Sequence, residues 1–85
     1  VIGQITPAEA LGVYTVQGEY NGRCWWRKGD WAIMFLYIEE YGSPVWAIVH
    51  LQNPAQYWAT TRGLTGSIYH PHREHTTGFA TVIYR

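Results

Sequence analysis

The chain has 85 residues, a length that predicts one small domain with a thin margin of stability. Six basic residues balance six acidic ones, so the net charge of zero excludes the positive field that nucleic-acid binding needs. Apolar types make up 47% of the chain, yet no uncharged apolar run approaches the roughly 18 residues of a membrane-spanning helix. We therefore expect a single domain over residues 1–85, with no nucleic acid and no membrane span among its partners. The sequence assigns it to no compartment.

The residue types favour strands throughout. Five Trp, seven Tyr and two Phe exclude a disordered chain, and nine Gly with four Pro interrupt the sequence at short intervals. Helical signals occur only at residues 6–12, where Thr6 suits a cap, Pro7 the first turn and Gly12 the end. We expect about one helical turn there, within an N-terminal arm of residues 1–11, and an all-β fold for the rest.

An aromatic-rich meander is predicted over residues 12–61. Asn21-Gly22 favours a type I′ turn, which predicts a hairpin of segments 12–20 and 23–28. Gly29-Asp30 indicates a second reversal before segment 31–38. That segment is apolar on both faces, so we expect a central strand that is covered on both sides.

The remaining segments complete a small antiparallel sheet. Strands are expected at 45–51 and 56–61, followed by a histidine-containing connection at 62–77 and a last strand within 78–85. Five or six short strands predict a meander that is curled and barrel-like or packed as a sandwich. Both chain ends are expected to be unused strand edges that can add to a neighbour's sheet.

One stretch of the sequence resembles a known repeat. It carries Gly12-Val13-Tyr14, Asn21-Gly22-Arg23 and Trp46-Ala47-Ile48 at spacings similar to those of an aromatic-rich β repeat found in proteins of algae and other microbial eukaryotes. Cys24 stands where that repeat usually has proline. The resemblance covers about residues 12 to 61 and implies a non-enzymatic module, often placed beside other domains or in tandem.

The aromatic residues are the main candidate site. Trp25 and Trp26 are adjacent in a predicted strand and must face opposite sides, and the same holds for Tyr57 and Trp58. Since so small a domain has little core, we expect some of these rings to lie near solvent or a partner. The alternative is that the domain buries them all. The predicted interface residues are Trp25, Trp26, Tyr57, Trp58 and Tyr84.

Histidines form the only cluster with ligand chemistry. His70, His72 and His75 could hold zinc or copper if a turn after Pro71 brought them together. Their spacing matches no established metal signature, so the favoured interpretation is a polar loop without a cofactor.

No catalytic motif is present. Cys24, His50 and the pair Glu39-Glu40 contain the residue types of a nucleophile and a base, but no phosphate-binding loop or nucleophile turn accompanies them. A buried, inert thiol is the simpler interpretation of Cys24. We do not expect an enzyme.

Two functions follow from the surplus of aromatic residues. The first is a structural or protein-interaction module that packs against copies of itself or another subunit, which the net charge of zero does not oppose. The second is a carbohydrate-binding module in which exposed Trp and Tyr rings stack on sugars.

Overall fold

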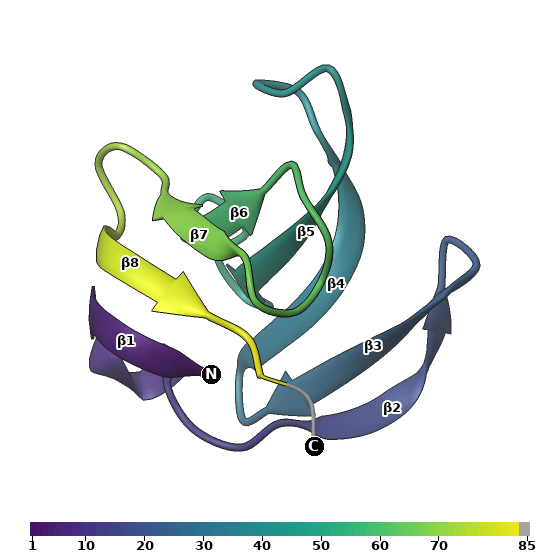
Figure 1. Ribbon diagram of the computed structural model, residues 1–85, viewed down its shortest axis with the longest axis horizontal. Coiled ribbons are helices and arrows are strands. Elements are labelled where there is room, and N and C mark those ends of the chain that lie inside the picture. Colours follow the sequence, from purple (N-terminus) through teal and green to yellow (C-terminus); the bar gives the residue numbers. More distant parts are fainter. Residues whose placement is uncertain (84–85) are drawn as a thin grey trace.

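The protein is one open antiparallel sheet of eight strands, curled on itself, in a computed structural model that describes residues 1–83. The strand order across the sheet is β1-β8-β7-β6-β5-β4-β3-β2, so β1 and β2 are its two edges (Figure 1). A single 3-10 turn, Ala8–Ala10, follows β1. The strands are β1 Ile2–Thr6, β2 Thr15–Tyr20, β3 Arg23–Lys28, β4 Trp31–Ile38, β5 Ser43–His50, β6 Tyr57–Thr60, β7 Ile68–Pro71 and β8 Thr77–Thr81.

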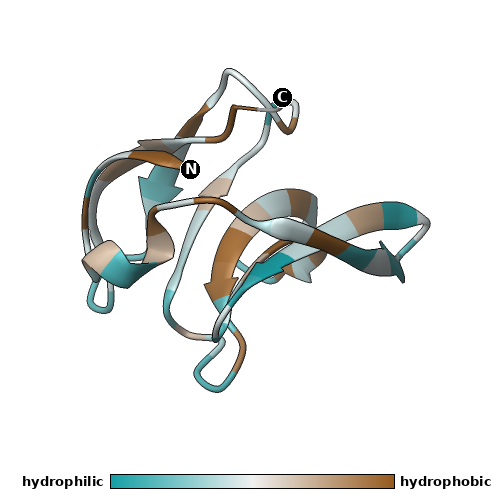
Figure 2. Ribbon diagram, turned by 90° about the horizontal axis from the view of Figure 1, so that it is seen from below, coloured by the Kyte–Doolittle hydropathy of each residue, from teal (hydrophilic) through white to brown (hydrophobic). Residues whose placement is uncertain are grey.

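The predicted all-β meander is confirmed. Asn21 and Gly22 both have positive φ, at 54° and 75°, as the predicted turn between β2 and β3 requires. Each later strand pairs with the one before it, and hydrophobic residues lie mainly in the strands (Figure 2). The short helical turn is also present, although Pro7 and not Thr6 precedes it and no side chain caps it.

The prediction of five or six strands is wrong, because two strands lie in segments assigned to an arm and to a connection. β1 lies in the predicted N-terminal arm and β7 in the predicted histidine connection. Both pair with β8: Ile2 lies opposite Thr81, and Tyr69 lies opposite Ala80. The first and last strands therefore pair with each other instead of forming two separate edges, so that of these two strands β1 alone lies at an edge of the sheet.

The concave face of the sheet holds the main core. Its buried residues come from strands between β1, at one edge of the sheet, and β4, and the partly buried Trp26 of β3 packs against them. The inside of a curled sheet brings strands this far apart in the sheet together. Trp58, Tyr69 and Ile48 are the largest fully buried side chains. The Trp58 indole donates a hydrogen bond to the Thr77 carbonyl at 3.2 Å, so its polar group is satisfied inside the core. This core contains Ile5, Ala10, Trp31, Ile33, Ile48, Trp58, Tyr69, Ala80 and Val82.

A second core lies on the outer face of β4, β5 and β6. Ala32, Ala47 and Ala59 are fully buried there, beside Val45, Val49 and Tyr57. On β4, Trp31 and Ile33 belong to the concave core while Ala32 belongs to the outer one. The prediction that this strand is covered on both faces holds for Trp31, Ala32 and Ile33, which are buried, whereas Tyr37 near its end is 63% exposed. Among residues 1–83 there is no helix that is both long and apolar enough to cross a membrane.

At two positions β1 and β8 leave no room for a side chain between their backbones. Gly78 has a φ of 79°, and a Cβ there would collide with the Gln4 carbonyl oxygen. Gly3 has a φ of 144°, and a Cβ there would collide with the Phe79 carbonyl oxygen. Two glycines, one on each strand, thus permit this approach, which places the side chains of β1 beside those of β8 and β7.

Candidate functional site

An apolar patch lies on the outer face at the β1–β8–β7 end of the sheet. Ile2, Thr81 and Ile68 lie opposite one another on three successive strands and so share a face. Phe79 precedes Thr81 by two residues, and Ile83 follows it by two, just after the end of β8. Val82, the residue before Ile83, is buried in the concave core, so Ile83 faces the other way. We call Ile2, Ile68, Phe79 and Ile83 the terminal patch; their exposed fractions are 56%, 55%, 56% and 53%.

The predicted aromatic interface is only partly at the surface. Trp25 packs against the outer core and Trp26 against the concave core, so the two rings face opposite sides as predicted, and both are half-buried. Tyr57 and Trp58 also face opposite sides, but both are buried, and Trp58 is 0% exposed. Both faces of their strand, β6, are covered, so neither ring of the second pair lies near solvent. Tyr84 lies outside the described residues.

Burial of the second pair has a simple cause. β6 lies between β5 and β7, and each of its faces contributes to one of the two cores. The Tyr57 ring is further covered by the His72 ring, with ring centroids 4.5 Å apart. Burial raises the pKa of Tyr57 to about 12, and the negative charge of Glu40 contributes to the shift. Tyr57 is thus a neutral, enclosed phenol at physiological pH.

The three predicted metal ligands are not brought together. His70 lies edge-on to Phe79, with ring centroids 5.4 Å apart, whereas His72 stacks on Tyr57. His75 stacks on the other side of His72 in a nearly parallel plane, at 5.5 Å and 10°. Ring nitrogens bind a metal in the plane of the ring, so stacked parallel rings cannot converge on one ion. No group of three His, Cys, Asp or Glu within residues 1–83 could hold a metal.

Cys24 and His50 are also far apart along the sheet. Cys24 is exposed on β3 opposite Glu19, so the expectation of a buried thiol is wrong. His50 lies opposite Trp31, beyond the other end of β3, and its Nδ1 accepts hydrogen bonds from the Gln52 and Asn53 amides. From Cys24 to Lys28 alone the strand rises about 13 Å. The two side chains therefore do not form a nucleophile and base pair.

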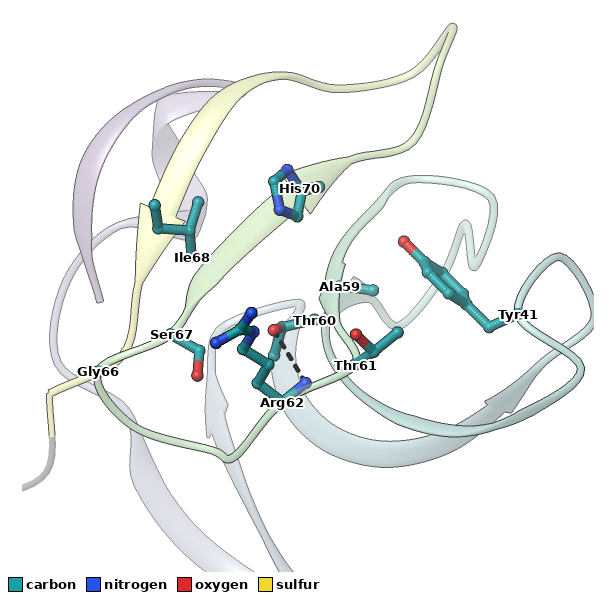
Figure 3. Close-up of a pocket in the computed structure, with 9 residues that line it drawn as sticks. All are labelled: Tyr41, Ala59, Thr60, Thr61, Arg62, Gly66, Ser67, Ile68 and His70. Carbon is teal, nitrogen blue, oxygen red and sulfur yellow. Dashed lines mark hydrogen bonds between the residues drawn. The ribbon is translucent and has the colours of Figure 1, made fainter.

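A hollow opens on the outer face beside β6 and β7. It has a volume of about 440 Å³, and Tyr41 from the β4–β5 turn stands on the opposite side from Ile68 and His70 (Figure 3). Ala59, whose side chain is no more than a methyl group, lies between them. Arg62 and Ser67, from the connection between β6 and β7, complete the rim. We call this feature the outer hollow.

The residues of the terminal patch and the outer hollow are almost all absent from the sequence-based candidates. The alternation of Phe79, Thr81 and Ile83 against Ala80 and Val82 signals two different faces, but it does not say which face stays uncovered. Ile2 and Ile68 join this patch only through the pairing of β1 and β7 with β8. Of the predicted site residues within 1–83, only His70 lines the outer hollow.

Comparison with known proteins gives no relative from which a function could be transferred: no family model, no curated protein and no solved structure matches the chain.

Proposed function

We propose that this domain is a non-catalytic interaction module that pairs with a second copy of itself through the terminal patch. The single observation that supports this is the gathering of Ile2, Ile68, Phe79 and Ile83, each more than half exposed, on one face of three adjacent strands. Contiguous exposed apolar side chains of this kind are typical of interaction sites. The function thus rests on aliphatic residues and Phe79 more than on the tryptophans.

A second copy is the partner that fits this patch best. In a two-fold dimer the same patch meets itself, so apolar side chains oppose apolar side chains without any further complementarity. The chain has a net charge of zero, so no long-range repulsion opposes the approach of two copies. Four side chains form a smaller contact than the roughly 800 Å² per partner of a standard interface. We therefore expect association that is weak and dependent on concentration.

Carbohydrate stacking on the predicted tryptophan and tyrosine pairs has less support. A platform needs rings that are exposed and side by side, and Trp58 is fully buried while Tyr57 is covered by His72. Trp25 and Trp26 lie on opposite faces of the sheet. A sugar that bound this domain would therefore bind at a surface site other than these two aromatic pairs.

Light scattering across micromolar to millimolar concentrations tests the proposal. We expect the wild-type mass to rise toward that of a dimer, and the double variant Ile2→Ser/Phe79→Ser to stay monomeric because it removes half of the patch. Val16→Ser is the matched control: Val16 is 60% exposed, but it lies on β2 at the opposite edge of the sheet.

Two results would contradict the proposal. A wild-type chain that remains monomeric at millimolar concentration would exclude self-association. Loss of the dimer in Val16→Ser, with the dimer retained in the double variant, would place the interface at the other edge.

A further inference from the structure

The outer hollow has a rim that is fixed by hydrogen bonds. The Arg62 amide donates to Thr60 Oγ1 at 3.2 Å, which holds the start of the β6–β7 connection (Figure 3). Further along, the Leu64 carbonyl accepts a 2.7 Å bond from the Tyr69 hydroxyl, and the Gly66 amide donates to the Val82 carbonyl at 3.0 Å. A rim that is already anchored loses little freedom when a ligand binds.

The charge inside the outer hollow is positive. Among the described residues that line it, Arg62 is the only permanently charged side chain and none carries a carboxylate. The Arg62 guanidinium has no ion-pair partner within residues 1–83. Burial, and after it the negative charge of Glu40, raises the pKa of Tyr41, but the Glu40 carboxylate itself lies against His72, with 3.4 Å between Glu40 Oε1 and His72 Nδ1. A single guanidinium without an acidic partner suits one carboxylate, which it can bind with two parallel hydrogen bonds.

The rest of the lining combines hydroxyl groups with small apolar surfaces. Thr61, Ser67 and Tyr41 each provide a hydroxyl, and within the described residues none of the three is hydrogen-bonded to another side chain. Tyr41 is also a flat ring, and Ala59 and Ile68 supply apolar contacts. A sugar ring has the matching surfaces, because its edge carries hydroxyls and its face carries C–H groups that pack on an aromatic ring.

We propose that the outer hollow binds a hexuronic acid residue, with the carboxylate on Arg62, the sugar face against Tyr41, and the hydroxyls toward Ser67, Thr61 and His70. A volume of about 440 Å³ lies within the range of small-molecule sites and accommodates one such residue. The outer hollow and the terminal patch share Ile68, whereas Arg62 and Tyr41 lie outside the patch. Substitutions of Arg62 and Tyr41 therefore test this binding without changing a residue of the proposed dimer contact.

NMR titration of the whole chain, followed through its backbone amides, tests this inference with six probes. Galacturonate and glucuronate each carry both features, while galactose and glucose lack the carboxylate and acetate lacks the ring. Inorganic phosphate tests for a general anion site. We expect saturable shifts at Arg62, Ser67 and His70 with at least one uronate, and affinities at least about tenfold weaker for its parent hexose, for acetate and for phosphate.

Variants separate the contributions of charge and ring. Arg62→Gln and Tyr41→Ala are each expected to weaken uronate binding about tenfold, and Arg62→Lys to fall between wild type and Arg62→Gln because it keeps the charge without the planar fork. Arg73→Gln is the matched control, since it removes the same charge from an exposed residue that does not line the hollow.

The inference would be overturned by any of three results. Equal binding of acetate or phosphate would reduce the hollow to a simple anion site. If the parent hexose bound as tightly as the uronate, Arg62 would not be recognising the carboxylate. Absence of shifts at the hollow with every probe, in a chain whose spectrum is that of the folded protein, would show that it is not a ligand site.

Discussion

At the scale of single residues, adjacent aromatic pairs show what a strand pattern can and cannot predict. Alternation correctly places Trp25 and Trp26 on opposite faces, and also Tyr57 and Trp58. It does not predict burial, which depends on the neighbouring strands. β3 lies one strand from an edge and leaves its pair half-buried, whereas β6 lies near the middle and encloses its pair.

Thr76 is a buried polar residue whose structural role could not be predicted from the sequence. Only 3% of it is exposed, and its hydroxyl accepts a 2.7 Å hydrogen bond from the His72 amide. The same hydroxyl lies 2.8 Å from the His72 carbonyl and 2.9 Å from the Tyr57 carbonyl, so it can donate to either. It thereby holds the β7–β8 connection against β6.

We expect Thr76→Val to lower the free energy of unfolding by about 0.5–1.5 kcal/mol, because it removes the hydrogen bonds of the hydroxyl without changing the shape of the side chain. The His72 amide and the Tyr57 carbonyl keep their 2.9 Å bond to each other. Urea denaturation measures the change. Thr77→Val, at the next and exposed position, is the control and is expected to change the free energy by less than about 0.5 kcal/mol. Equal effects at both positions would contradict the assigned role of the Thr76 hydroxyl.

At the scale of elements, local signals predict the strands joined by tight turns. Asn21-Gly22 and Gly29-Asp30 define β2, β3 and β4 because each signal acts within a few residues. β1 is missed as a partner of β8 because about seventy residues separate the two strands in the sequence. Their contact depends on Gly3 and Gly78, whose significance emerges only once the strands are paired.

Gly78→Ala is expected to detach β1 from β8, since the new methyl group would occupy the position of the Gln4 carbonyl oxygen and the φ of 79° is unfavourable for alanine. We expect a loss of about 2 kcal/mol or more in the free energy of unfolding, with faster amide hydrogen exchange concentrated in β1.

Gly63→Ala is the matched control for this substitution. Nothing lies within 4 Å of a Cβ at Gly63, and its φ is not in the positive region. We expect its stability to equal or slightly exceed that of the wild type. An intact β1 in Gly78→Ala would mean that the close approach of the two strands is not needed for their pairing.

At the scale of the whole molecule, the all-β architecture can be predicted from the composition. The curvature of the sheet and the features of the protein surface cannot. The apolar character of both faces of residues 31–38 correctly predicts two layers of core. The terminal patch and the outer hollow could not be predicted, because each is assembled from strands or turns distant in sequence. The sequence points to aromatic residues, whereas the most exposed apolar side chains are mainly aliphatic.

Stability of the whole fold is expected to fall at alkaline pH. Burial raises the pKa of Tyr14 and of Tyr69 above the ordinary value of 10.0, and that of Tyr57 to about 12. The folded chain therefore holds these protons more tightly than the unfolded chain. Their contribution is complete below about pH 10 and is lost as the pH rises through the folded values.

Urea denaturation at about pH 8 and about pH 11 measures this loss. Tyr57→Phe removes one ionisable group and is expected to make the loss smaller, while Tyr20→Phe, which removes an exposed phenol, leaves it unchanged. Unfolding free energies that stay constant between the two pH values would contradict the assignment.

The close packing of aromatic rings in and around the concave core affects the fluorescence of the protein. Trp26 and Trp46 lie 6.3 Å apart, Phe35 lies 5.2 Å from Trp46, and Trp31 lies 5.6 Å from Trp58, all at tilted angles. Chromophores this close and this rigidly oriented share their electronic excitation, so absorbed energy migrates among the indoles before it is emitted. Since no tryptophan of the described residues lines the outer hollow, we expect an occupant of that site to change the tryptophan fluorescence little.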